Sequence, residues 1–331
     1  MTNKKILVTG GAGFIGSHLT DHLLSLGYQV TVIDNLVNGN LNNLSEAKKN
    51  QNFTFVHGDI LDKQLCIDVA KDCAFIFHLA CLGVRHSIHS PFENHRVNAE
   101  GTLNVLEAAK QNNIEHFFYI STSEIYGRTT SFPITEEAAT APLTVYGASK
   151  LVGEHYTNAY NECYQLNTTV LRIFNNYGPR AHYEGDAGEI IPRSIVRILN
   201  NEKPIIFGDG LITRDFFFVK DTARALAGLI GNPNINYKTF NIGTGVEYTM
   251  KDLLLKVLEL MDKQELGLEY LADRPADVPR LWVKADKFYN ATNFKANYSF
   301  ENGLKETIQY YIDLSSKKDL IKDIKINNWE K

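Results

Sequence analysis

The sequence contains little cysteine, and its cysteines are poorly spaced for metal or redox chemistry. Its 331 residues include four: Cys66, Cys73, Cys81 and Cys163. No two of them have the C-x-x-C spacing of zinc or redox sites, and a chain of this length can build a stable core without disulfides. His86 and His89 lack an evident third ligand. We therefore expect reduced thiols and no metal site.

Long apolar runs and an excess of charge of one sign are also missing. No stretch approaches the roughly 18 apolar residues that cross a bilayer, and the apolar run near the start ends at Thr9, which is too short for a signal peptide. The 34 basic and 38 acidic residues give a formal net charge of −4. This balance does not indicate nucleic acid or an anionic membrane as a partner. We expect a cytoplasmic protein that binds neither.

Short apolar runs alternate with amphipathic stretches through the first half of the chain. The predicted strands are Ile6–Thr9, Gln29–Asp34, Phe53–Val56, Ala74–Leu79, Phe117–Ser121 and Thr169–Phe174. The predicted helices are Gly16–Leu26, Asn98–Gln111 and Val145–Tyr164. This rhythm indicates βαβ units. The predicted fold class is α/β, a doubly wound parallel sheet of the Rossmann type with ligands at the carboxyl ends of its strands.

A glycine-rich turn joins the first predicted strand to the first helix. Gly10 permits a tight turn, Gly13 allows a pyrophosphate to approach the backbone, and Gly16 allows close helix–strand packing. The first helical amides then face the phosphates. The turn, with its residues Phe14 and Ile15, predicts a dinucleotide site, although a purely structural turn is the alternative.

Asp34 ends the second predicted strand, 18 residues after Gly16. A carboxylate there can accept hydrogen bonds from the adenosine ribose and would repel a 2′-phosphate, which favours NAD over NADP. An ordinary strand-end turn residue is the alternative. Further cofactor contacts are expected at the ends of strands: Asn35, Asp59, Ile60, Leu79 and Ala80.

The second half has a looser pattern. Strands are predicted at Ile205–Phe207, Phe216–Val219 and Thr239–Ile242, and helices from about Pro192 and at Thr249–Met261 and Glu301–Leu314. We expect a smaller C-terminal substrate-binding lobe. The predicted division is an NAD-binding domain of residues 1–175, with returning segments at about 215–245, and a lobe of residues 176–214 and 246–331.

Tyr146 and Lys150 lie four residues apart near the start of a predicted helix and so share one face. Free tyrosine has a pKa of about 10, too high for a base at neutral pH. A nearby ammonium and an oxidised nicotinamide both favour the phenolate, which could take a hydroxyl proton while hydride leaves for NAD. Because this spacing is common on surface helices, the interpretation depends on the glycine-rich turn.

A polar segment, Thr122, Ser123 and Glu124, follows the strand Phe117–Ser121. In a doubly wound sheet this position lies over the nicotinamide, so the three residues are candidate catalytic groups. A polar turn leaving the sheet is the alternative.

Together these residues resemble the extended short-chain dehydrogenase/reductase superfamily, and within it the NAD-dependent nucleotide-sugar epimerases and dehydratases. The resemblance runs from Lys4 to about Lys287. It rests on Gly10-x-x-Gly13-x-x-Gly16, Asp34, His78-Leu-Ala80, Thr122, Tyr146-x-x-x-Lys150, Phe174-Asn-Asn-Tyr-Gly-Pro179 and Arg214-Asp-Phe. It implies that Tyr146 is the base, that Lys150 holds the nicotinamide ribose, that Thr122 binds the C4 oxygen of the sugar and that Asn98 lies near the cofactor. It also implies a homodimer.

The same resemblance implies a nucleotide-diphosphate sugar as substrate. Asn175 matches a residue at the sugar–diphosphate junction, Arg214 and Arg274 match residues that hold the diphosphate, and Asp277 matches one near the nucleotide ribose. Arginine suits this task because its guanidinium matches phosphate oxygens, although surface ion pairs are the alternative. Lys284 departs from the family, which often has aspartate there. Two further substrate contacts are expected: Arg85, after the fourth strand, and Glu189, which otherwise is only a helix-start carboxylate.

The residues after Thr122 bear on the reaction. The superfamily oxidises the sugar at C4, and a carboxylate at Glu124 could then remove the acidic C5 proton. Similar 4,6-dehydratases often have aspartate where this chain has Ser123. We favour a nucleotide-hexose dehydratase, with 4,6- or 5,6-elimination. The alternatives are a 4-epimerase of UDP-hexoses or UDP-uronates, which Gly83–Ile88 also resembles, then a UDP-glucuronate decarboxylase, and finally a non-catalytic dinucleotide-binding protein.

Overall fold

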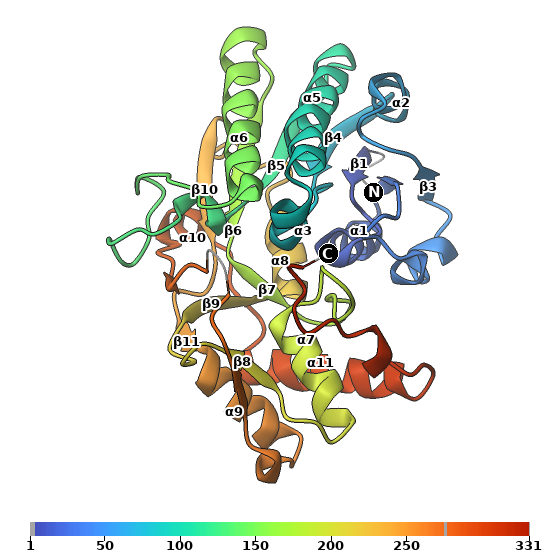
Figure 1. Cartoon of the computed structure of the whole chain (residues 1–331). Helices are drawn as coiled ribbons and strands as arrows, with labels where there is room; N and C mark the ends of the chain where they lie inside the picture. Colours follow the sequence, from blue (N-terminus) through green and yellow to red (C-terminus); the bar gives the residue numbers. More distant parts are fainter. Residues whose placement is uncertain (1–3, 275–276, 331) are drawn as a thin grey trace.

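Residues 4–274 and 277–330 are described by the computed structural model, which has an α/β architecture (Figure 1). Seven strands form its main sheet: β1 (Lys5–Thr9), β2 (Gln29–Asp34), β3 (Phe53–His57), β4 (Cys73–His78), β5 (His116–Thr122), β6 (Thr168–Ile173) and β10 (Lys238–Ile242). Their order is β10-β6-β5-β4-β1-β2-β3, and every pairing is parallel. The predicted doubly wound parallel sheet is confirmed.

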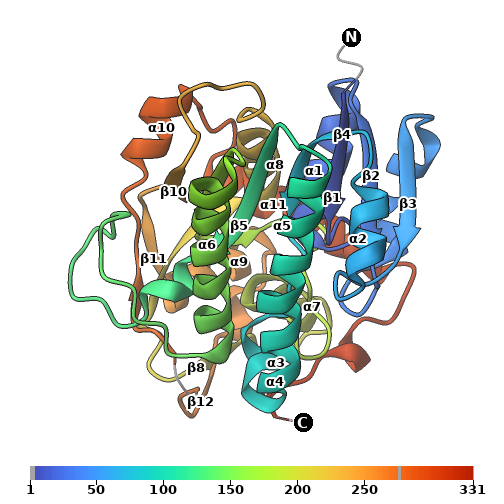
Figure 2. The same ribbon diagram turned by 90° about the horizontal axis from the view of Figure 1, so that it is seen from above.

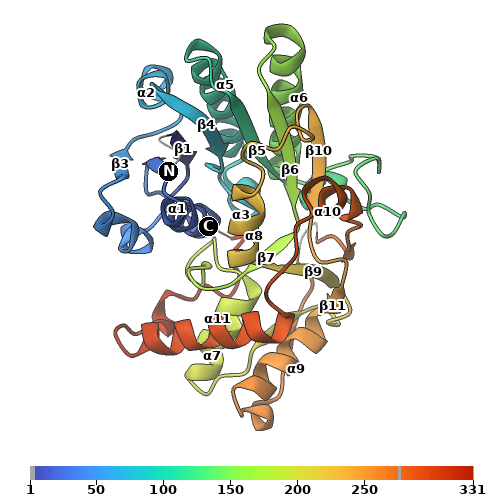
Figure 3. The ribbon, with the colours of Figure 1, turned by 180° about the vertical axis from the view of Figure 1, so that it is seen from behind.

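Helices cover both faces of this sheet, because the side chains of each strand alternate between two apolar clusters. On β1, Ile6 and Val8 belong to one core and Leu7 to the other. The first face carries α1 (Phe14–Ser25), α8 (Val219–Ala227) and α10 (Asp286–Thr292), as Figure 3 shows. The second carries α2 (Lys63–Val69), α5 (Gly101–Gln111) and α6 (Val145–Tyr164), which lie in front of the sheet in Figure 2.

A smaller lobe lies below the carboxyl ends of the main strands in Figure 1. Its strands are β7 (Asn175–Tyr177), β8 (Ile205–Phe207), β9 (Thr213–Phe218), β11 (Glu247–Thr249), β12 (Glu269–Leu271) and β13 (Arg280–Leu281). Its helices are α7 (Ile190–Leu199), α9 (Met250–Leu260) and α11 (Phe300–Ser315). A third apolar core joins these helices to β9.

Several segments differ from the prediction. The predicted strand Phe216–Val219 is wrong at both ends, because β9 begins at Thr213 and stops at Phe218. Val219 begins α8, which packs on α1. β9 pairs with β7, β11 and β13, whereas β10 returns to the main sheet. Two short helices, α3 (Val84–His89) and α4 (Pro91–His95), follow β4 and were not predicted.

No helix in residues 4–274 or 277–330 is both long and apolar enough to span a membrane.

Candidate active site

A cavity of about 560 Å³ lies at the carboxyl ends of the main strands, where the lobe faces the sheet. All but two of the predicted site residues line it: Gly10, Gly13, Phe14, Ile15, Gly16, Asp34, Asn35, Ile60, Leu79, Ala80, Arg85, Thr122, Ser123, Glu124, Tyr146, Lys150, Asn175, Glu189, Arg214, Arg274 and Asp277. The fold thus brings together residues that are spread over nearly 270 positions of the sequence.

The two exceptions, Asp59 and Asn98, support the wall from behind. Asn98 is buried, and its side-chain amide accepts a hydrogen bond from the Leu82 N–H (2.8 Å) and donates one to the Leu82 carbonyl (2.9 Å). Asp59 accepts a hydrogen bond from the side-chain amide of Asn35 (2.9 Å). Both therefore hold residues that line the cavity.

The glycine-rich turn is packed too tightly for side chains. Gly10 has φ +68° and a Cβ there would lie 2.7 Å from the backbone nitrogen of Ala80. A Cβ on Gly16 would collide with the carbonyl oxygen of Gly10. At Gly13, by contrast, the only near atom is that same carbonyl, at 3.2 Å, so this position is left free for a ligand's phosphates. The turn fits a dinucleotide cofactor.

Asp34 lies at the end of β2 beside this turn. Its carboxylate accepts hydrogen bonds from the backbone N–H groups of Ala12 (2.9 Å) and Leu36 (2.8 Å). Burial raises the pKa of Asp34, and these two hydrogen bonds oppose the rise. The carboxylate is held in place at the cavity wall, where it can accept the hydroxyls of a ribose.

His78 supports the turn from the end of β4. Its ring is fully buried between the hydroxyls of Thr9 (2.7 Å) and Thr102 (2.9 Å). Burial lowers the pKa of His78 well below its usual value, so the ring is neutral. Thr9 also accepts a hydrogen bond from the Ala80 N–H (3.2 Å), which fixes the backbone opposite Gly10.

Tyr146 and Lys150 occupy the first turns of α6, which begins after Thr144, whose hydroxyl accepts the Gly147 N–H (3.1 Å). Lys150 is buried, with its ammonium 4.3 Å from the centre of the Tyr119 ring. Burial lowers the pKa of Lys150 and raises that of Tyr146 well above its usual value, and a hydrogen bond with Thr122 opposes the second shift. In the protein alone Tyr146 is therefore protonated at neutral pH.

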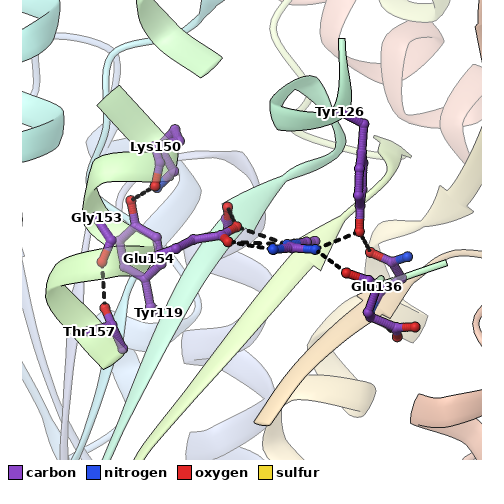
Figure 4. A network of polar contacts seen from close by, with 10 residues as sticks. Tyr119, Tyr126, Glu136, Lys150, Gly153, Glu154 and Thr157 are labelled. Carbon is purple, nitrogen blue, oxygen red and sulfur yellow. Dashed lines mark hydrogen bonds and ion pairs between the residues drawn. The ribbon is translucent and has the colours of Figure 1, made fainter. Parts of the chain in front are cut away.

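A buried polar network behind this pair was not predicted from the sequence. The Glu154 carboxylate on α6 accepts hydrogen bonds from Arg172 on β6 (2.7 Å to Nη2) and from Ser121 on β5 (2.5 Å). Arg172 also donates a hydrogen bond to the Tyr126 hydroxyl (2.8 Å). Figure 4 shows Glu154 and Tyr126 at opposite ends of this row of hydrogen bonds. The network fixes β5, which ends at Thr122, against the helix that carries the Tyr–Lys pair.

Glu124 follows directly in the 3₁₀ turn Ser123–Tyr126, where Thr122 accepts the Glu124 N–H (3.2 Å). Burial raises the pKa of Glu124, while the positive charges of Arg214 and Arg85 oppose the rise. Within residues 4–274 and 277–330, no hydrogen bond or ion pair engages its carboxylate. It is therefore a half-buried carboxylate, open to a ligand in the cavity.

The lobe side of the cavity is rich in arginine. Arg214 is anchored by Asp277 (2.7 Å) and the Val278 carbonyl (2.7 Å). Arg85 pairs with Glu189 (3.3 Å). The guanidinium of Arg274 lies over the Phe207 ring, and no described residue accepts a hydrogen bond from its buried Nε.

Burial lowers the pKa of Arg274 to about 9, and the neighbouring charge of Arg85 acts in the same direction. Asn175 also has a buried side-chain oxygen that accepts no hydrogen bond from the part of the chain that the structure describes. Crowded cations and unused hydrogen-bonding atoms at this end fit an anionic ligand such as a diphosphate.

The described part of the chain contains no cluster of three or more side chains arranged to hold a metal ion. His86 instead faces Glu93 (3.3 Å), and His89 faces Asp186 (2.7 Å). Cavity residues missed by the sequence reasoning include Phe207 and Trp329, whose positions depend on how the lobe folds.

The doubly wound sheet, the glycine-rich turn after β1 and the Tyr–Lys pair on α6 place the chain in the extended short-chain dehydrogenase/reductase superfamily. The chain belongs to the family whose model is described as GDP-mannose 4,6 dehydratase, which matches residues 7–307.

Relatives of two activities are similar to it. A putative UDP-glucose 4-epimerase of Methanocaldococcus jannaschii is 36% identical over 312 residues, which cover 92% of this chain and 97% of the relative. The solved UDP-N-acetylglucosamine 4-epimerase of Methanobrevibacter ruminantium has a TM-score of 0.90 at 32% identity, covering 95% and 100% of the two chains. The dTDP-glucose 4,6-dehydratase of Streptomyces venezuelae, solved with NAD bound, has a TM-score of 0.90 at 29% identity, covering 96% and 99%.

Proposed function

We propose that this protein is an NAD-dependent nucleotide-hexose dehydratase, which oxidises the sugar at C4 and then eliminates water. The observation that carries the choice of elimination is Glu124, a half-buried carboxylate in the cavity that no described residue hydrogen-bonds or pairs with. Simple hydride return needs no such group, whereas removal of the C5 proton does.

The residues present fit NAD. The turn around Gly13 would hold the pyrophosphate, Asp34 the adenosine ribose and Lys150 the nicotinamide ribose. When bound, NAD supplies a nicotinamide that accepts hydride from the sugar and later returns it. The similar dehydratase of Streptomyces venezuelae was solved with NAD, which supports this assignment.

Tyr146 takes the proton from the C4 hydroxyl. Since burial alone keeps its phenol protonated, the positive charges of Lys150 and the bound cofactor are needed to favour the phenolate. Thr122 lies within hydrogen-bonding reach of Tyr146 and positions the same sugar oxygen.

Glu124 takes the C5 proton once C4 is a ketone. The leaving hydroxyl needs a proton, and Ser123 stands where similar dehydratases often have aspartate. Serine is too weak an acid for this role. The same Glu124 carboxyl therefore returns its proton to the departing hydroxyl. Burial raises the pKa of Glu124, which favours both proton transfers near neutral pH.

Glu124→Gln separates oxidation from elimination. We expect the variant to reduce its bound NAD when substrate is added and to lose at least a hundredfold in dehydration, the order of magnitude of one general base. Glu301→Gln, at an exposed carboxylate on α11 outside the cavity, is the matched control and should retain elimination. Full product formation by Glu124→Gln would contradict the proposal.

A 4-epimerase is the second candidate, because two of the similar proteins carry that description. In addition, this chain has Ser123 at the position where similar dehydratases often have an acidic residue. An epimerase product would have the mass of the substrate. Decarboxylation of a UDP-glucuronate is the third and would release carbon dioxide. The homodimer and the cytoplasmic location stay predictions. Analytical sedimentation at the concentration used for activity assays tests the homodimer.

A further inference from the structure

The C-terminal tail, residues 316–330, lies beyond the region that the family model matches. After α11 the chain turns through a short 3₁₀ segment, Ile321–Asp323, and runs back toward the cavity. Figures 1 and 2 both show the dark red tail ending beside α3, far from the end of α11 where it starts. The tail therefore crosses the lobe to reach the substrate side of the molecule.

Side chains and backbone anchor this tail along its length. Leu320 is buried in the core of the lobe. The Asp323 carbonyl accepts the Gly185 N–H (3.1 Å), and the Lys325 ammonium pairs with Asp186 (3.0 Å). The tail is thus tied to the loop that precedes α7.

Two buried polar side chains strengthen the attachment near the cavity. Arg193 of α7 donates to the carbonyls of Lys325 (2.8 Å) and Ile326 (2.9 Å). Asn328 is fully buried and donates to the Gly188 carbonyl (2.9 Å). Because Gly188 precedes Glu189, the tail also fixes the backbone of a cavity residue.

Trp329, next to this anchor, is the part of the tail that lines the cavity. Its ring meets the Phe207 ring edge to face, with centres 5.1 Å apart and planes at 78°. The Arg274 guanidinium carbon lies 4.3 Å from the Phe207 ring and 5.7 Å from the Trp329 ring. Two aromatic rings thus lie beside a cation whose Nε–H has no acceptor among residues 4–274 and 277–330.

The order of groups in a nucleotide sugar identifies what reaches these rings. The sugar must lie at Tyr146 and Glu124, and the diphosphate suits the arginines beyond them. The nucleoside then extends past Arg274, and its flat base is the part of the substrate that stacks on aromatic rings.

We propose that the tail is part of the substrate site, with Trp329 as the outer wall of the pocket for the nucleotide base and Asn328 as the residue that positions it. The inference rests on the nucleotide-sugar part of the proposed function and is independent of whether elimination or epimerisation follows.

The chain has two tryptophans, which allows a direct optical test. Trp282 lies outside the cavity, with its indole N–H on the Gly245 carbonyl (2.8 Å). In Trp282→Phe holoenzyme, titration with UDP, dTDP, GDP or CDP should change Trp329 emission saturably. In Trp329→Phe, where Trp282 is the remaining reporter, the same titration should leave the emission unchanged.

Affinity gives the second readout. Trp329→Ala should weaken nucleoside diphosphate binding by about tenfold, the scale of one aromatic or cation–π contact. The loss should fall on KM more than on kcat. Trp329→Phe should largely restore affinity, and Trp282→Ala should bind as the wild type does.

Two results would overturn the inference. The first is tight binding to the wild type with unchanged Trp329 emission and equal affinity in Trp329→Ala, which leaves the proposed function standing. The second is failure of the wild type to bind any of the four nucleoside diphosphates, which overturns the nucleotide-sugar function and the tail's role with it.

Discussion

Replacing Glu154 by Gln should destabilise the protein strongly, although the residue lies outside the cavity. Glu154 and Arg172 have side chains only 4% and 9% exposed, so water cannot replace the lost charge. Three guanidinium–carboxylate contacts join them, at 2.7, 3.1 and 3.2 Å. The amide that replaces one oxygen would point N–H groups at a guanidinium or at the Ser121 hydroxyl, which donates to Glu154 now.

The expected cost is about 3–5 kcal/mol in the free energy of unfolding, because removing one partner leaves a buried, uncompensated charge. The Glu154→Leu/Arg172→Met double variant removes both charges and should recover much of that loss. Lys305→Ala, which breaks the exposed pair with Glu301, is the control and should leave stability nearly unchanged.

Urea unfolding of the four proteins at one fixed NAD concentration measures these differences. A Glu154→Gln variant within about 1 kcal/mol of the wild type would refute the reasoning, since exposed rather than buried pairs behave in that way. Equal losses in the single and double variants would also refute it, because the cost would then come from packing and not from an unpaired charge.

Three further predictions concern the cofactor and the base. Gly16→Ala should lose bound NAD on purification, because the added Cβ collides with the Gly10 carbonyl; cofactor content measured after heat release checks this, and full occupancy would contradict it. Asp34→Asn should narrow the preference for NAD over NADP by removing the charge that repels a 2′-phosphate, as reconstitution with each cofactor would show. Burial raises the pKa of Glu124, and the carboxyl must be ionised to act as a base, so kcat/KM should fall as the pH is lowered. The midpoint of this fall should lie above about 4.3, the usual pKa of glutamate. A midpoint at or below that pH would exclude Glu124 as the base.

The main sheet could be predicted because its strands are short apolar runs with buried faces on both sides. β1 contributes Ile6 and Val8 to one core and Leu7 to the other, so its three central positions are all apolar and the run is conspicuous in the sequence. Short helices such as α3 carry too few turns to show a periodic pattern, and they were missed. The end of β9 was misplaced because the apolar run continues from strand into helix at Val219.

The cavity residues on the main sheet were predictable for a different reason. Parallel strands bring their carboxyl ends to one edge, so Asp34 and Glu124 had to face the same side once the strands were assigned. Contacts between side chains away from this edge follow no such rule. Glu154 on α6 pairs with Arg172, a charged residue inside the strand Thr168–Ile173, and no periodic pattern indicates that pair. Trp329 contacts Phe207 only because the C-terminal tail turns back toward the cavity.

The mass of the product tests the central claim most directly. Purified protein with NAD would be incubated with a panel of nucleotide-hexoses and nucleotide-uronates, and the products would be weighed. The account predicts a product lighter than its substrate by one water. A product of unchanged mass and altered retention would contradict it, and would make the protein an epimerase in which Glu124 binds the sugar.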